Sequence, residues 1–550
     1  MRITKGNLFL VAIVLALPSI VLSQAAPPDL VLFNGKIFTS NSIQPYVEAL
    51  AIRGERIVAV GSSREIIALA GKETKRIDLS ERTVIPGIND AHHHFGTGPD
   101  TYDLPITRRD LSWQEIKDAI SAAVAKVQKG TWIRGVMDEA VLDDPRATRR
   151  ALDQLAPDHP VMLHIWGANV ALLNTTALRR VGVRDDQPNP EGGVYARNPA
   201  HGELTGMTFQ FALFQIGRHY SELASDQQAT QDLSDFFDSA ARLGITSVQD
   251  MANSISAQRC AALLAKAPPP IRVRVIWFGL TDEHGRLTHE GRGLPQHPAP
   301  LVTVSGTKWI LDGTPIDHSG AMREPYSDRP TTSGELNFSE REMEEMLRES
   351  LRNDDQLMVH VAGDRTAETF LNAMDATGGE KVWSQRRIRL EHGDGLLPDL
   401  VPRAKRLGVI VVQNPIHFTL PELFNKRFGE KRAQQLQPFK SLLDAGIPVA
   451  IGSDGPNNPY LNIMLASTYG RNPPQAMTRE QAVTAYTLTS AYAEFAEKEK
   501  GSFEPGKLAD LAVLSQDIFT SPVGDLPKTQ SVMTMVGGKI VYDAKVVTIH

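Results

Sequence analysis

Six side chains that can bind a metal ion or carry a proton lie at or just after the ends of short apolar runs. They are His92, His94, Lys308, His360, His392 and Asp454. Side chains at positions i and i+2 of an extended segment point the same way, so His92 and His94 can bind one ion while His93 turns aside. A single histidine is more often an ordinary core or surface residue, but this ordered set predicts a metal centre.

Lys308 needs a separate explanation, because a buried ammonium group next to a metal cation is electrostatically unfavourable. If its pKa is lowered, the lysine amine can react with carbon dioxide to give a carbamate. A carbamate is anionic and has two oxygens, so it can bridge two metal ions about 3.5–4 Å apart. The alternative is an ion pair with a nearby carboxylate such as Asp312.

Eight apolar runs alternate with helical stretches through the middle of the chain, a pattern typical of βα units around a parallel sheet. The predicted strands cover residues 84–88, 245–250, 272–277, 307–311, 357–361, 388–392, 409–413 and 448–454. Eight such units predict a (β/α)8 TIM barrel over residues 86–499, in which active-site residues stand at the C-terminal strand ends. A doubly wound open sheet is the alternative.

The other parts of the chain have different patterns. The gap between the first two strands, from residue 95 to 243, is too long for one βα connection. It predicts an inserted lid domain at about residues 100–240, with an amphipathic helix over Trp113–Val127. Residues 28–85 and 500–550 both contain short alternating runs separated by turn residues, which predicts one β-sandwich domain built from both chain ends.

Several segments together resemble the amidohydrolase superfamily, and specifically amidohydrolase family 3, the YtcJ-like group that includes N-substituted formamide deformylases. The matching segments are Pro86–His94, Lys308–Gly313, Val359–Arg365, Arg389–His392, Gly452–Pro456 and Gly501–Leu511. The resemblance extends over nearly all of the chain after its first residues. It implies a metal-dependent (β/α)8 barrel, a small composite β domain, and hydrolysis of an amide, formamide or cyclic amide C–N bond by a metal-activated water.

The resemblance also implies roles for individual residues. His92 and His94 would hold the more buried of two Zn²⁺ ions together with Asp454, which would also be the general base. His360 and His392 would hold the more exposed ion, and carboxylated Lys308 would bridge the two. The predicted substrate contacts are His318, Arg323, Tyr326 and Asn169.

Three other functions are compatible with these residues. An esterase or lactonase could use the same metal pair, which discriminates little between oxygen and nitrogen leaving groups. A mononuclear deaminase could use His92, His94, His360 and Asp454, although such deaminases usually carry a glutamate near the fifth strand, and here Val361–Asp364 follows His360. An inactive binding protein is the least favoured, because such proteins normally lose metal ligands and none is missing.

Composition and charge narrow the class of protein and the kind of ligand that the sequence favours. With 41% hydrophobic and 22% charged residues, the chain is neither collagen-like nor wholly disordered. Lys and Arg number 58 against 64 Asp and Glu, a formal net charge of −6, so no basic excess favours nucleic-acid binding. We therefore expect a small-molecule substrate, and a homodimer is compatible with the sequence. Cys260 is the one cysteine and cannot form an intramolecular disulfide.

The first 25 residues predict a cleaved secretory signal. Arg2 and Lys5 precede an apolar run from Leu8 to Leu22, and small residues follow at Ser23 and Ala25. We expect a periplasmic or secreted protein with no membrane association after cleavage.

Overall fold

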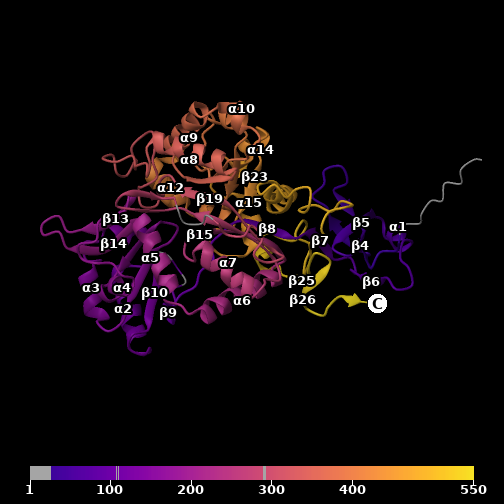
Figure 1. Ribbon diagram of the computed structural model, residues 1–550, viewed down its shortest axis with the longest axis horizontal. Coiled ribbons are helices and arrows are strands. Elements are labelled where there is room, and N and C mark those ends of the chain that lie inside the picture. The colour runs from indigo at the N-terminus through magenta and orange to yellow at the C-terminus, as the bar shows by residue number, and fades with distance from the viewer. Residues whose placement is uncertain (1–25, 107, 109–110, 289–292, 550) are drawn as a thin grey trace, which may run out of the picture.

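The computed structural model describes residues 26–106, 108, 111–288 and 293–549. A barrel occupies the centre of the molecule, an inserted α/β unit lies at one end, and a β-sandwich lies at the other (Figure 1). The predicted signal, residues 1–25, lies outside the described residues. Within the described part, no helix is both long enough and apolar enough to cross a membrane.

The barrel consists of eight parallel strands whose order around the sheet follows the chain. They are β8 (Ile88–His93), β15 (Ile245–Ala252), β16 (Arg272–Phe278), β19 (Val302–Ile310), β20 (Leu357–Val361), β21 (Arg389–His392), β22 (Ile410–Gln413) and β23 (Val449–Ile451). Where β23 meets β8, the Asp454 N–H donates to the His92 carbonyl at 3.0 Å. The predicted (β/α)8 barrel is confirmed, and the open-sheet alternative is excluded.

The first predicted strand, residues 84–88, is wrong because the chain changes sheets within it. Strand β7 (Thr83–Pro86) pairs with sandwich strands, and the barrel strand β8 begins at Ile88. Gly87 lies between the two, and a Cβ atom there would come within 2.1 Å of the Thr246 hydroxyl. The residue at this change of sheet must therefore be glycine, because the chain passes so close to β15.

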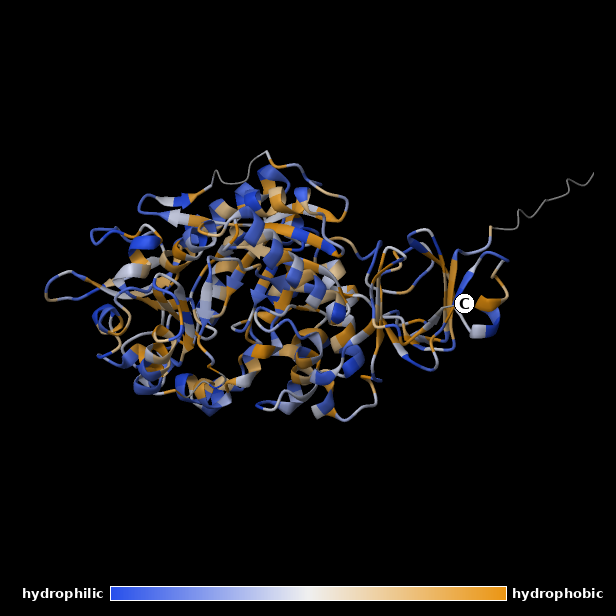
Figure 2. Cartoon of the chain, turned by 90° about the horizontal axis from the view of Figure 1, so that it is seen from below, coloured by the Kyte–Doolittle hydropathy of each residue, from blue (hydrophilic) through white to orange (hydrophobic). Residues whose placement is uncertain are grey.

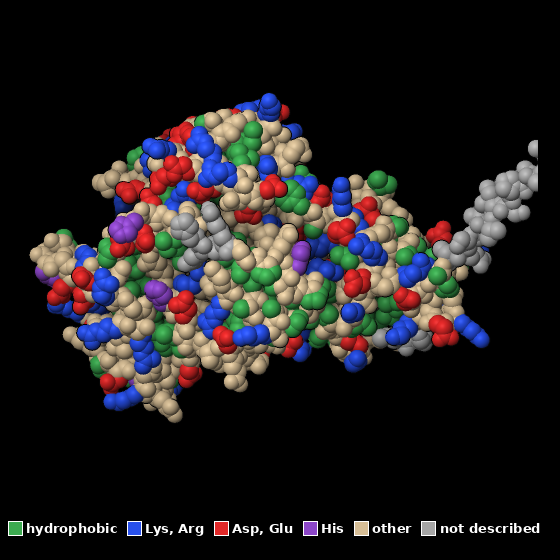
Figure 3. Space-filling view, viewed as in Figure 1, with side chains coloured by type: hydrophobic (Ala, Val, Ile, Leu, Met, Phe, Trp, Pro, Cys, Tyr) green, Lys and Arg blue, Asp and Glu red, His purple; other side chains and the backbone are tan. Residues whose placement is uncertain are grey.

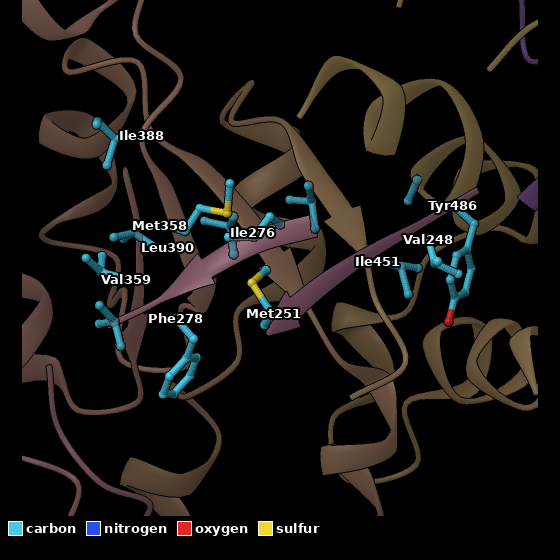
Figure 4. Close-up of a cluster of buried hydrophobic side chains, with 14 of the residues drawn as sticks. Val248, Met251, Ile276, Phe278, Met358, Val359, Ile388, Leu390, Ile451 and Tyr486 are labelled. Atoms are coloured by element: carbon cyan, nitrogen blue, oxygen red, sulfur yellow. The ribbon is translucent and has the colours of Figure 1, made fainter. Parts of the chain in front are cut away.

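Helices cover the outside of the barrel, and their apolar faces pack on the strands. The main ones are α6 (Asp226–Arg242), α7 (Ala257–Lys266), α8 (Glu340–Asn353), α9 (Asp364–Ala376), α11 (Val401–Arg406), α14 (Phe439–Asp444) and α15 (Pro459–Thr468). Between β16 and β19 the chain forms a hairpin, β17 (Leu280–Asp282) and β18 (Gly285–Leu287). Figure 4 shows part of the buried cluster, with side chains from several barrel strands including Val248, Ile276 and Leu390.

The insertion follows β8 and contains its own six-stranded sheet. Its strands are β9 (Thr101–Asp103), β10 (Trp132–Met137), β11 (Val161–Ile165), β12 (Val170–Leu173), β13 (Gly193–Arg197) and β14 (Leu204–Gln210). Its helices are α2 (Trp113–Val124), α3 (Arg149–Leu155), α4 (Thr175–Arg180) and α5 (Phe211–Glu222). The predicted amphipathic helix is present as α2. Helix α6, which was predicted as part of the insertion, instead packs on β15 and on the sandwich strand β25.

Strands from both chain ends form the two sheets of the sandwich. One sheet contains β27 (Thr548–Ile549), β6 (Lys75–Asp78), β1 (Leu30–Phe33), β4 (Ala49–Arg53) and β5 (Arg56–Gly61). The other contains β26 (Lys539–Asp543), β25 (Ser531–Val536), β24 (Leu511–Leu514), β7, β2 (Lys36–Phe38) and β3 (Tyr46–Val47). One buried apolar cluster draws side chains such as Leu32, Ile52 and Met535 from both sheets, and Figure 2 colours these strands largely hydrophobic.

Candidate metal centre

All six predicted metal-site residues lie around one cavity at the C-terminal end of the barrel. The cavity has a volume of about 180 Å³, and its lining includes His92, His94, Lys308, His360, His392 and Asp454. A larger cavity of about 340 Å³ is also lined by His94 and Asp454. His93 turns away from the other two histidines, with its ring on Phe236 and its Nε2 3.1 Å from Asn457 Oδ1.

The four histidines share one feature, which is that one ring nitrogen of each is hydrogen-bonded to an oxygen acceptor. The pairs are His92 Nδ1 with Glu391 Oε2 at 2.6 Å, His94 Nδ1 with the Met251 carbonyl at 2.8 Å, His360 Nε2 with the Gly313 carbonyl at 3.2 Å, and His392 Nδ1 with Asn414 Oδ1 at 2.8 Å. Because these oxygens carry no proton, the bonded nitrogen must donate. The opposite nitrogen of each ring then keeps its lone pair, as in metal-binding histidines whose orientation is held by an outer acceptor.

The lone pairs converge with a carboxylate. His92 Nε2 and His94 Nε2 lie 3.2 Å apart, and His94 Nε2 lies 3.4 Å from Asp454 Oδ1. Ligand atoms of His92, His392 and Asp454 lie within 4.8 Å of one another. Two nitrogen lone pairs and a carboxylate at these distances repel one another unless a proton or a metal cation lies between them, so this donor set fits a divalent metal ion.

Burial and the charges of neighbouring groups determine the protonation states of the histidines and of Asp454. Burial lowers the pKa of His92 to about 4, and burial together with the Lys308 charge lowers that of His360 to about 3. Burial alone would also lower the pKa of His94, but its hydrogen bond to Asp454 raises it above the ordinary value. Burial opposes ionisation of Asp454, yet the surrounding histidines, His92 first, hold its pKa well below the ordinary value. Asp454 is therefore a carboxylate at neutral pH.

Lys308 lines this cavity, with only 1% of its surface exposed. Its Nζ has no hydrogen-bond partner among the described residues, and burial lowers its pKa to about 8. The alternative ion pair with Asp312 is not formed. Asp312 instead accepts hydrogen bonds from the backbone of Ala321, Ala362 and Gly363 and from the Thr366 hydroxyl. A buried amine without a partner, facing several metal ligands, is compatible with carboxylation.

Two residues that contact the centre were not predicted from the sequence. Glu391, which accepts from His92, also receives both Nε and Nη2 of Arg389 at 2.7 and 3.2 Å. His417 lies on a 3-10 turn after β22 and places its Nε2 3.6 Å from Asp454 Oδ2. The sequence contained one indication of each residue. Glu391 directly precedes His392, and His417 follows the predicted strand at residues 409–413, to which no polar residue had been assigned.

Replacing Glu391 with Gln is expected to weaken metal binding by about 10–100-fold, because His92 loses the carboxylate that fixes its tautomer. The apparent dissociation constant can be measured by competition with a chromogenic chelator. Glu497→Gln is a matched control, since Glu497 pairs with Arg387 and is absent from the lining of the metal cavity. An unchanged metal affinity in Glu391→Gln would contradict the positioning role.

The predicted substrate contacts divide into two groups. Asn169, on the loop between β11 and β12, lines the metal cavity and donates to Gln210 Oε1 at 3.1 Å. The other three are absent from the lining of that cavity. His318 contacts Asp328, Arg323 pairs with Glu368 and Asp399, and the buried Tyr326 hydroxyl donates to the Gly320 carbonyl. Their loop packs on α12 (Pro421–Phe428) instead, where Tyr326 contacts Phe428.

Comparison with known proteins agrees with this geometry. The sequence profile of the amidohydrolase family matches residues 75–542. The chain belongs to the amidohydrolase family. This amidohydrolase is 27% identical to an N-substituted formamide deformylase of Arthrobacter pascens, over 94% of this chain and 98% of the relative. It is also 27% identical to the putative amidohydrolase YtcJ of Bacillus subtilis, over 93% of this chain and 98% of the relative.

The fold of this amidohydrolase is found in solved structures. An uncharacterized metal-dependent hydrolase from Pyrococcus horikoshii superimposes with a TM-score of 0.70 at 22% identity, covering 90% of this chain and 99% of the other. Family and fold together identify a hydrolase, and the predicted resemblance is confirmed. On the face shown in Figure 3, acidic and basic side chains are interspersed.

Proposed function

We propose that this amidohydrolase hydrolyses the C–N bond of an amide, formamide or cyclic amide at a centre of two divalent metal ions, with zinc preferred. The observation that carries the proposal is the set of four histidines, each with one nitrogen held by an oxygen acceptor and the other free to bind a metal. The formamide deformylase named among the relatives supports a C–N bond as the target.

The residues divide between the two ions by their position in the barrel. His92, His94 and Asp454 would hold one ion, and His360 and His392 the other. The unpartnered Nζ of Lys308 fits a carbamate that binds both ions. Divalent ions at such a site polarise a carbonyl and lower the pKa of water.

Asp454 is the residue best placed to transfer protons. It is ionised at neutral pH, and both of its oxygens face the centre, Oδ1 toward His94 at 3.4 Å and Oδ2 toward His417 at 3.6 Å. It can take a proton from the attacking water and deliver it to the leaving amine. His417 is positioned to hold Asp454 in this orientation.

Removal of metal from the purified enzyme is expected to abolish amide hydrolysis, and zinc is expected to restore it. The measurement combines metal analysis with a hydrolysis screen over formamides, N-acyl amines, cyclic amides, lactones and aryl esters. Activity that survives complete metal removal would contradict the proposal. Cleavage of esters or lactones in strong preference to matched amides would favour the esterase alternative instead.

Export is part of the same proposal and rests on residues 1–25 alone, whose charged start and apolar run are typical of a secretory signal. Sequencing the N-terminus of the mature chain tests it.

A further inference from the structure

A row of small pockets, which we call the channel, leads away from the metal cavity along residues of the insertion such as Trp166 and Gly167. A second pocket of about 30 Å³ shares Gly167, Thr314, His360, His392 and His417 with the metal cavity. A third, of about 10 Å³, shares Trp166, Ile316 and Leu420 with the second. The three pockets therefore adjoin one another, and an elongated substrate with its scissile bond in the metal cavity would extend along this line.

The walls of the channel beyond the metals are apolar and acidic. Trp166, Ile316, Leu420 and Phe424 supply the apolar surface of the second pocket. The charged side chains there and in the third pocket are carboxylates, namely Asp394 in the second and Asp138 and Glu139 in the third. Among the described residues, no lysine or arginine lines either pocket.

Asp394 is the unexplained group in the channel. It is only 4% exposed, and its Oδ1 accepts no hydrogen bond from any described residue. Leaving a buried carboxylate oxygen without a donor is costly, so a donor supplied by a ligand would be strongly favoured. The nearby arginines are used elsewhere, since Arg471 donates to Gln437 and Tyr469 and Arg427 pairs with Asp328.

We propose that the channel binds an ammonium group carried on a short apolar stem. This inference rests on the proposed C–N hydrolysis, and it means that the preferred substrates are amides whose far end is cationic. Asp394 accepts from the ammonium, and Trp166 and Phe424 pack against the stem and favour the cation. Amides that end in a carboxylate are disfavoured, because they meet three carboxylates and no basic side chain in these two pockets.

The test uses three amides of equal length, each in formyl and acetyl form. One is the monoacyl amide of diaminobutane, the second is the methyl-ended N-acylpentylamine, and the third is the carboxylate-ended N-acyl-aminopentanoate. We expect kcat/KM to be highest for the ammonium-ended amide by about 10-fold or more. Asp394→Asn should lower that value about 10–100-fold, mainly through KM, and should change the methyl-ended amide by no more than about 2-fold.

Asp375→Asn is the matched control, because Asp375 lies on α9, pairs with Arg403 and Arg406, and is absent from the lining of the channel pockets. It should leave all three substrates unchanged. Hydrolysis without a charge preference, or with a preference that Asp394→Asn leaves intact, would overturn the inference while the proposed function stands.

A binding measurement separates the two proposals if no amide is cleaved. Calorimetric titration of the intact enzyme with pentylammonium and with pentanol reports on the channel alone. Tighter binding of pentylammonium that is lost in Asp394→Asn upholds the ammonium site even if the proposed C–N hydrolysis fails. Equal binding of the two probes overturns the ammonium site.

Discussion

Replacing Asp454 with Asn is expected to lower kcat/KM by about 10²–10⁴-fold, the range observed when a general acid–base residue is removed. Asn has the shape of Asp but no proton affinity at neutral pH. Its amide group would also place N–H donors or a neutral oxygen where the histidine lone pairs converge, 3.4 Å from His94 Nε2. Both proton transfer and metal binding therefore suffer.

The measurement is steady-state kinetics with the best substrate of the screen, together with metal content. Asp444→Asn is the control, since Asp444 is an exposed residue on α14 paired with Lys440. If Asp454→Asn kept more than about a tenth of the wild-type kcat/KM, Asp454 would not be the base, because such a loss lies below the general acid–base range.

Replacing Lys308 with Met is expected to abolish activity, by about 10³-fold or more given the size of metal contributions to catalysis, and to remove one of two metal equivalents. Met matches the length of Lys but cannot form a carbamate. Because the Lys308 amine is buried and has no hydrogen-bond partner among the described residues, its removal should leave the metal-free protein as stable as before or more stable. Loss of function without loss of stability is the distinguishing result.

Metal counting, thermal unfolding and labelling with isotopic bicarbonate, read by carbon NMR, provide the measurements. Lys500→Met is the contrasting control. Lys500 is also buried, but its Nζ pairs with Glu494 at 2.8 Å and donates to Ser247 at 2.8 Å. Its loss leaves the Glu494 carboxylate without its ion-pair partner and should cost about 3–5 kcal/mol of stability while metal content is kept. A Lys308→Met protein that retains both metal equivalents would rule out the bridging carbamate.

Much of the fold could be predicted because it depends on local patterns. Apolar runs that alternate with helical stretches identified all eight barrel strands, although the first predicted strand began in the wrong place. Residues 83–93 are buried almost without interruption, and the change of sheet at Gly87 depends on the close approach of Thr246, more than 150 positions away. No local pattern marks such a contact, so periodicity alone merged two strands into one.

In the candidate site, too, local spacing predicted some residues, whereas others depend on contacts between distant parts of the chain. The i and i+2 spacing of His92 and His94 fixes their common direction in an extended segment at the end of β8, and the structure places both at the cavity. Glu391 was missed because its partner His92 lies 299 positions away. His318, Arg323 and Tyr326 lie on a long loop that packs on α12 through Tyr326, and none of the three lines the metal cavity.

The sequence by itself indicated the eight barrel strands, the β-rich character of both chain ends and the side chains that could bind a metal, since these follow from residue type and short-range spacing. Tertiary structure alone decided which nitrogen of each histidine faces the cavity. It also decided that, among the described residues, Lys308 Nζ has no hydrogen-bond partner and Asp394 lines a pocket with no lysine or arginine. Those properties depend on acceptors and cavities built by segments far apart in the chain. The physical reason is that closure of the barrel brings these distant segments together, whereas a local stretch of sequence contains only one member of each contact.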